Sequence, residues 1–182
     1  MKRRTWLPML LTALLVGGGP AALAHGPTPQ KIEEHVIIAR PPATVWAAIR
    51  EFGAVDTWNP FFVEVHASGG NEPGKAEREL KLAQGGSLRE SLDEYDPARR
   101  YLGYRLLKEN VEAFPVSFYT VTIEVKASGE GSDVEVLGRF YRADTGNFPP
   151  EHLNDEAAVA AMQKMTRTGL DTLQRMLEQG AP

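Results

Sequence analysis

The sequence contains no cysteine among its 182 residues. This absence excludes disulfide bonds, cysteine-ligated metals, thiol catalysis and a lipoprotein anchor. A long basic run is also missing, and the formal net charge is −4 at pH 7. An acidic chain of this kind is a poor candidate for binding nucleic acid or an anionic membrane surface, because both would repel it.

Sequence signatures of common catalytic sites are missing as well. The chain has no Ser-His-Asp order, nucleophile elbow, phosphate-binding loop or dinucleotide-binding motif. His35, His66 and His152 show no metal-ligand spacing. Copper ligation by His25 at a mature N-terminus would need a second histidine nearby, so we interpret His25 as part of a flexible tail. These absences predict no catalytic residues, no metal and no cofactor.

The first 24 residues have the pattern of an export signal. Lys2 to Arg4 form a basic start, Trp6 to Val16 are an apolar run too short to span a bilayer, and Ala22 to Ala24 form an A-x-A cleavage site. We therefore predict a signal peptide at residues 1–24 and a periplasmic mature domain at residues 25–182. Loss of three of the 20 Lys and Arg residues leaves 17 against 24 Asp and Glu, a net charge of −7.

The hydrophobic pattern of the mature chain begins with a strand and two short helices. Val36 to Ile38 end a strand-like run, and Pro41-Pro42 start a helix that Gly53 is expected to close. A second short helix is expected around Val55 to Phe61. From Phe62 to Asp144 the period changes to two, with turn signals about every ten residues, which predicts an antiparallel meander.

The chain is predicted to end in one long helix. Asn154 can cap it, Asp155 and Glu156 place favourable negative charge in its first turn, and the pattern continues to Gln179. The order of elements predicts an α+β fold of the helix-grip kind. In this fold a curved antiparallel sheet of six or seven strands surrounds the C-terminal helix, with an apolar cavity between them.

Two charged residues are expected inside this fold. The strand pattern places Arg78 on the same face as Leu80, and Glu90 on the same face as Leu88 of the next strand. Burial of either charge alone would cost several kcal/mol, so the two side chains should pair. Two roles remain open: a polar grip for the carboxylate or hydroxyl of a ligand, or a structural ion pair that closes the sheet.

The other candidates for ligand binding are aromatic residues and methionines. Their spacing is compatible with the lining of a pocket for a hydrophobic ligand and equally with simple core packing. These candidates are Trp58, Phe61, Tyr119, Phe140, Met162 and Met165.

Several short motifs follow one another along nearly the whole mature chain. They are Pro41-Pro42-Ala43 with Val45-Trp46, Trp58-x-Pro60, Glu90 with Glu94-Tyr95-Asp96-Pro97, Tyr104-Arg105, Pro115-Val116-Ser117-x-Tyr119, Gly138-Arg139-Phe140 and Gly169-Leu170-x-x-Leu173. In this order the motifs resemble the START/Bet v 1-like (SRPBCC) superfamily, specifically its polyketide cyclase/dehydrase and lipid-transport group. The resemblance implies the helix-grip fold and a cavity for a hydrophobic ligand.

A narrower resemblance concerns the mature start, His25 to Lys31. It is similar to the start of the MxaD family, periplasmic proteins of the same fold that are associated with methanol oxidation. Members of that family are described as assisting the encounter of methanol dehydrogenase with its cytochrome c electron acceptor. The resemblance implies a non-enzymatic accessory protein whose partner is a quinoprotein alcohol dehydrogenase, its cytochrome c, or both. Asn59 stands where that family usually has a histidine.

Three functions therefore remain open from the sequence. The first is the accessory role, with docking expected at an exposed apolar rim near Trp58 to Phe62 and Phe114 to Ser117. The second is a carrier or sensor of a small hydrophobic ligand. The third is an enzyme of the cyclase or dehydrase kind that uses Glu90 or a tyrosine as general acid or base.

The export signal leads to a first testable prediction. When the full chain is produced in a host with a periplasm, we expect cleavage between Ala24 and His25. N-terminal sequencing of the periplasmic protein should therefore begin at His25. A protein that begins at Met1, or that stays in the membrane fraction, would contradict the prediction.

Overall fold

A computed structural model describes residues 26–180, and the predicted signal peptide lies outside them. The elements follow one another as β1 (Gln30–Ile38), α1 (Pro42–Ile49), η1 (Phe52–Thr57), β2 (Phe62–Ser68), β3 (Glu77–Leu82), β4 (Ser87–Asp96), β5 (Tyr101–Lys108), β6 (Val116–Ser128), β7 (Gly131–Arg142), η2 (Glu151–Leu153) and α2 (Asp155–Gln179). Here η marks a 3₁₀ helix. This order confirms the predicted α+β arrangement of sheet and long C-terminal helix.

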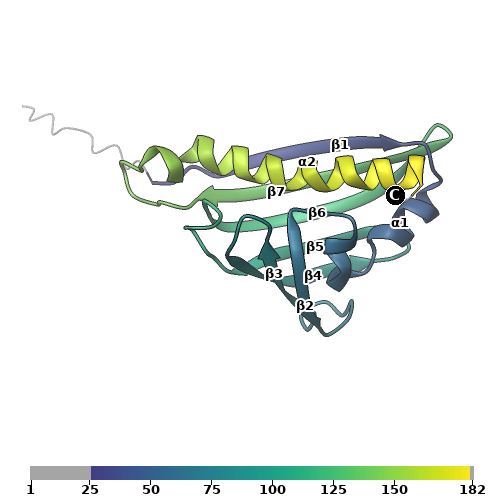
Figure 1. Cartoon of the computed structure of the whole chain (residues 1–182), viewed down its shortest axis with the longest axis horizontal. Helices are drawn as coiled ribbons and strands as arrows, with labels where there is room; N and C mark the ends of the chain where they lie inside the picture. The colour runs from purple at the N-terminus through teal and green to yellow at the C-terminus, as the bar shows by residue number, and fades with distance from the viewer. Residues whose placement is uncertain (1–25, 181–182) are drawn as a thin grey trace, which may run out of the picture.

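Within the described residues, seven strands form one antiparallel sheet in the order β1-β7-β6-β5-β4-β3-β2. Sequential strands from β2 to β7 are neighbours, as expected for a meander. The first strand is the exception, because it pairs with the last. Figure 1 shows the sheet curving away beneath α2, which lies along β1 and β7, and the contacts of α2 with these two strands agree with that view.

The long helix has the predicted ends. The side-chain oxygen of Asn154 accepts a hydrogen bond from the backbone N–H of Ala157 at 2.8 Å, which caps the first turn. Gly180, with a φ of 82°, follows the last turn. The buried positions of the helix form a stripe toward the sheet: Ala158, Met162, Met165, Thr166, Gly169, Leu170 and Leu173. No helix in residues 26–180 is long and apolar enough to cross a membrane.

The second short helix differs from the prediction. It is a 3₁₀ helix that begins at Phe52 and ends at Thr57, so Gly53 lies inside it and does not close α1. Phe52 and Val55 are both buried, and their spacing of three matches the 3₁₀ repeat. The α conformation is disfavoured for Asn59 because Pro60 follows it, and a turn replaces the expected helix from this point.

Strand alternation builds the core on the inner face of the sheet. Val121, Ile123 and Val125 of β6 are buried, and Val134 and Val136 lie beside them on β7. The polar residues between them point to the outer face. Burial of one face of the sheet against α2 therefore follows directly from the period-two pattern.

Gly169 allows α2 to approach the turn that contains Trp58 and Asn59. A Cβ atom at this position would lie 2.7 Å from Asn59 Nδ2 and 2.8 Å from Trp58 Cζ3. Both distances are shorter than a normal contact, so any larger residue would push the turn away from the helix. This explains a glycine inside a helix, where it costs about 1 kcal/mol relative to alanine.

The close approach predicts an inverted effect of helix propensity. Gly169→Ala should destabilise the protein by about 1–2 kcal/mol because of overpacking, although alanine is the better helix former. Ala160→Gly, at an exposed position of the same helix, should show the ordinary cost of about 1 kcal/mol. Urea unfolding of both variants measures these changes. A stabilising effect of Gly169→Ala would contradict the close packing of the turn against the helix described above.

Candidate functional site

The site is built around the two charged residues expected in the interior. Arg78 of β3 and Glu90 of β4 are direct partners in the strand register. Their side chains are only 4% and 1% exposed. Both lie on the inner face because Leu80, Leu88 and Leu92, two residues away along the strands, are also buried there. This placement agrees with the cross-strand pair expected from the sequence.

Hydrogen bonds engage both ends of this pair. Arg78 Nε donates to Glu90 Oε2 at 2.5 Å, and Arg78 Nη1 donates to the carbonyl oxygen of Phe52 at 2.6 Å. The hydroxyl of Tyr119 donates to Glu90 Oε1. Each oxygen of the Glu90 carboxylate therefore receives a hydrogen bond, as a buried charge requires.

Two aromatic rings complete the surroundings of the guanidinium. Arg78 Cζ lies 4.1 Å from the ring centroid of Phe52 and 4.7 Å from that of Tyr104. The faces of these rings attract the cation and replace part of its lost hydration. The group of Phe52, Arg78, Glu90, Tyr104 and Tyr119, called here the Arg78 network, thus joins η1 with strands β3, β4, β5 and β6.

Burial keeps both tyrosines of this network protonated. It raises the pKa of Tyr119 well above its ordinary value, and the negative charge of Glu90 acts in the same direction. Burial and then Glu90 also raise the pKa of Tyr104, against a smaller opposing effect of Arg78. Tyr119 therefore serves as a hydrogen-bond donor and not as a phenolate base.

A small cavity lies next to this network, between α2, the turn after η1 and the sheet. Its volume is about 20 Å³, enough for about one water molecule. Tyr104 belongs both to the Arg78 network and to this cavity, called here the Trp58 cavity. The lining consists of Trp58, Asn59, Phe62, Tyr104, Ile123, Val136, Met165, Thr166 and Leu170.

Trp58, one of the residues that line this cavity, has an unusual buried indole nitrogen. Trp58 is 7% exposed, and its buried Nε1 has no hydrogen-bond partner among the described residues. A buried indole N–H ordinarily has an acceptor. A water molecule or a ligand oxygen in the cavity would be an acceptor of the right chemistry.

Asn59 has a structural role in the turn beside the cavity. Its Nδ2 donates to the carbonyl oxygen of Met165 in α2 at 3.2 Å, and its Oδ1 accepts from the backbone N–H of Phe61 at 3.2 Å. Asn59 therefore connects the turn to the long helix.

The eight residues predicted to bind a ligand fall into three groups. Trp58 and Met165 line the Trp58 cavity. Arg78, Glu90 and Tyr119 form the hydrogen-bonded core of the Arg78 network. The other three are buried in the hydrophobic core and do not line this cavity: Phe61, Phe140 and Met162.

Sequence reasoning missed Tyr104, Asn59 and Thr166 as part of the site. Tyr104 carried a usable signal, since it alternates with Leu102 and Leu106 on one strand face. Thr166 is one residue from Met165 and lies at the border of the apolar stripe of α2. Its position depends on how far the helix is rotated toward the sheet, which the stripe alone does not define.

The residues expected to form an exposed apolar docking rim are buried. Trp58, Phe61 and Phe62 are at most 7% exposed, and Phe114 and Val116 are completely buried. The aromatic rings pack edge-on against one another, with the Phe61 and Phe114 centroids 6.0 Å apart. The large apolar residues exposed in the described part of the chain are instead Ile37, Val63, Leu107, Phe118 and Phe148.

The structure also brings together residues that could hold a metal ion. His35 lies beside Glu33 on β1 and Glu135 on β7, on the outer face of the sheet and away from the Arg78 network. The sequence spacing of His35 gave no indication of this arrangement, because Glu135 is 100 residues away along the chain.

Comparisons with known proteins agree with the helix-grip arrangement. The family model described as "Polyketide cyclase / dehydrase and lipid transport" matches residues 29–178. None of the curated proteins compared with the chain matches it.

Solved structures of the same shape come from several bacteria. The protein XoxI from Bacillus cereus is 24% identical, with a TM-score of 0.68, over 84% of this chain and 99% of its own. The Zhui aromatase/cyclase from Streptomyces sp. R1128 is 18% identical, with a TM-score of 0.68, over 85% and 100%. A protein from Nitrosospira multiformis is 20% identical, with a TM-score of 0.65, over 81% and 96%. At these identities the likeness shows the fold alone.

The Arg78 network predicts strong coupling between its charges. Arg78→Ala and Glu90→Ala should each cost about 3 kcal/mol of the free energy of unfolding, because each change leaves the other charge buried without its partner. The double variant should cost less than the sum of the two single changes. Denaturant unfolding of the four proteins gives this coupling energy.

An exposed pair on the same two strands supplies a matched control. Arg89 of β4 and Glu77 of β3 form an ion pair with side chains 54% and 36% exposed. Its double-mutant cycle should yield less than about 1 kcal/mol. Additive and small effects at Arg78 and Glu90 would mean that these side chains are solvated in solution.

Proposed function

The chain belongs to the polyketide cyclase/dehydrase and lipid transport family, and from this premise we propose that it is a non-enzymatic periplasmic accessory protein. In this role it assists a quinoprotein alcohol dehydrogenase, such as a methanol dehydrogenase, and the cytochrome c that accepts its electrons. The protein acts by binding one or both of these partners and increasing the rate at which they associate.

The observation that supports the non-enzymatic part of the proposal is the hydrogen bonding of Glu90 within the Arg78 network. Glu90, the residue expected as a general acid or base, is completely buried, and both of its oxygens accept hydrogen bonds from Arg78 and Tyr119. The adjacent Trp58 cavity measures about 20 Å³. A substrate would first have to open the core and break these bonds before Glu90 could exchange a proton with it.

The charge of the protein supports a role that depends on a partner. The described residues carry 17 Lys and Arg against 24 Asp and Glu. An acidic protein attracts a basic partner over a distance comparable to the Debye length and so accelerates their encounter. Steering of this kind suits a transient complex between redox proteins.

A groove on the outer face is the docking site in this proposal. It has a volume of about 290 Å³ and is lined by Pro29 to Lys31 together with Phe118 and Arg139, among others. Both charged lining residues are basic, so in this proposal the steering charge lies on the acidic surface outside the groove. Phe118 is 42% exposed, so its ring offers a partner an apolar contact in the groove. Residues 29 to 31 also belong to the segment that resembles the MxaD family.

A carrier of a small hydrophobic ligand is the second candidate function. The Trp58 cavity favours it, since the unpartnered Trp58 Nε1 supplies a donor and Phe62, Ile123, Val136, Met165 and Leu170 supply an apolar lining. A ligand larger than one water molecule requires this cavity to widen. Met165 is suited to such a change because a methionine side chain adapts its shape readily.

The accessory role predicts faster electron transfer between the two redox partners. Addition of the mature protein to a quinoprotein alcohol dehydrogenase and its cytochrome c should raise the rate of cytochrome reduction at low salt. The gain should shrink as salt rises, because ions screen the attraction. Stopped-flow absorbance of the cytochrome measures the rate. Phe118→Ala should reduce the gain, whereas Val63→Ala, at an exposed apolar position of β2, should preserve it.

An unchanged rate at every salt concentration, with no complex in a pull-down, would contradict the accessory role. Native mass spectrometry of the purified protein then separates the remaining candidates. A bound small molecule would favour the carrier. Conversion of an added substrate that is lost in a Glu90→Gln variant would favour an enzyme.

A further inference from the structure

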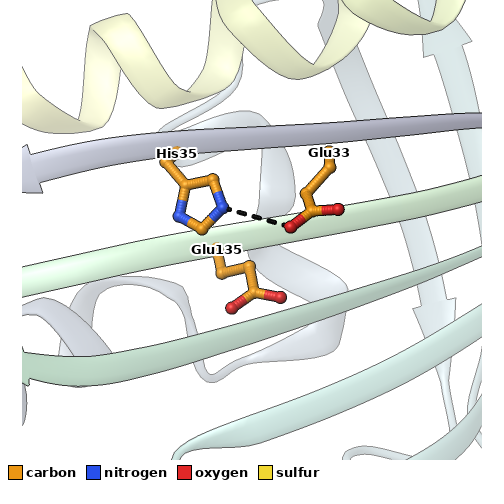
Figure 2. Close-up of side chains that lie close together, drawn as sticks. All are labelled: Glu33, His35 and Glu135. Atoms are coloured by element: carbon orange, nitrogen blue, oxygen red, sulfur yellow. Dashed lines mark ion pairs between the residues drawn. The ribbon is translucent and has the colours of Figure 1, made fainter.

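A histidine and two glutamates lie together where β1 pairs with β7. Glu33 and His35 are two residues apart on β1, so both point to the outer face, and Glu135 is the direct partner of His35 in the register. One potential ligand atom of each residue lies within 4.8 Å of those of the other two. Figure 2 shows the His35 ring directed toward the Glu33 carboxylate, with Glu135 next to them.

Asp133 orients the ring of His35. The two oxygens of its carboxylate lie 3.2 and 3.3 Å from His35 Nδ1. When Nδ1 carries the hydrogen and donates it to Asp133, the lone pair resides on Nε2. Nε2 is on the side of Glu33, whose Oε1 is 3.6 Å away. Histidines that bind metals commonly have this second contact, in which a carboxylate fixes the tautomer and the orientation of the ring.

Two lysines hold the glutamates in a similar way. Lys31 Nζ lies 2.5 Å from Glu33 Oε2, and Lys126 Nζ contacts Glu135 Oε2. In each carboxylate the lysine thus engages one oxygen, and the other oxygen, Oε1, is the candidate ligand atom. Each of the three side chains is therefore positioned by a neighbour on the atom that a metal would not use.

The charge of this cluster is negative, which favours a cation. Lys126 also contacts Glu124, at 3.5 Å. Glu124 also contacts Arg99, at 3.4 Å. With His35 neutral, the carboxylates of Glu33, Glu124, Asp133 and Glu135 therefore outnumber Lys31, Lys126 and Arg99 by one charge. This excess attracts a cation to the centre of the cluster.

We propose that Glu33, His35 and Glu135 form a binding site for a divalent transition-metal ion, with Asp133 as a positioning residue. One imidazole and two carboxylates are a ligand set that Zn²⁺ accepts, and three protein ligands leave a fourth position for water or for a donor from a partner. The site goes beyond the accessory role and does not depend on it.

Metal binding requires only small movements of these side chains. With metal–ligand bonds of about 2.1 Å, the ligand atoms of a tetrahedral site are about 3.4 Å apart. The side chains of Glu33 and His35 are 46% and 43% exposed, so they have room to turn inward. Their backbones are fixed in the paired strands β1 and β7, which keeps the cluster together.

Titration calorimetry of the mature protein with ZnCl₂ tests the proposal. One site is expected, and His35→Gln or Glu135→Gln should each weaken its Kd at least about tenfold. Asp133→Asn should also weaken it about tenfold while the site remains. Zinc should shift the amide NMR signals of residues 31–36 and 132–136 more than those elsewhere, which locates the ion on β1 and β7.

Two controls separate this site from unspecific binding. His66→Gln is the matched variant, because His66 Nε2 lies 2.8 Å from the carboxylate of Glu64 in another exposed histidine–glutamate pair. His25→Ala removes the histidine expected at the mature N-terminus. Both variants should keep the Kd of the unaltered protein. The proposal is wrong if zinc does not bind, if His35→Gln leaves the Kd unchanged, or if His66→Gln or His25→Ala weakens binding as strongly. Circular dichroism melting of each variant verifies that it is folded.

Discussion

The ion pair between Arg78 and Glu90 constrains the interior of this protein. Two buried charges need hydrogen-bonding or aromatic partners in place of water. Residues of η1 and of the strands β3 to β6 supply these partners. A shift of β3 against β4 by one residue would move Arg78 and Leu80 of β3 to the outer face and leave Glu90 buried without its partner. The pair therefore defines the register of these strands. It also engages both carboxylate oxygens of Glu90, the residue that the cyclase interpretation would need as a general acid or base.

The turn between η1 and β2 provides the second constraint, because it determines how closely α2 approaches the sheet. Asn59 binds a carbonyl oxygen of α2, and Gly169 leaves the space in which Trp58 and Asn59 lie. The volume left between helix and sheet is small for this reason. A member of this fold with a longer turn or a smaller residue than Trp58 would enclose more space without any change in the order of its elements.

The sequence was sufficient for most of the fold and for part of the site. Period-two alternation identified the strands and the inward direction of Arg78 and Glu90, and the Asn154 cap identified the start of α2. It failed for η1, because six residues do not distinguish a 3₁₀ from an α repeat. It also failed for the rim, since the apolar character of Phe61 and Phe114 does not reveal whether they meet each other or solvent. The cluster around His35 depends on the pairing of β1 with β7, which no local pattern contains.

That pairing also has a consequence for the order in which the chain can fold. Gln30 is paired with Phe140 and Ile38 with Ser132. The first strand therefore cannot pair until β7 has been synthesised. Contacts between residues so distant in sequence form late and slow the folding of small domains. Until then β1 is an unpaired strand with apolar residues on one face, which is the kind of segment that chaperones bind. A chain whose first strand pairs with its last strand remains unfolded for longer after synthesis than one whose first strand closes a local hairpin.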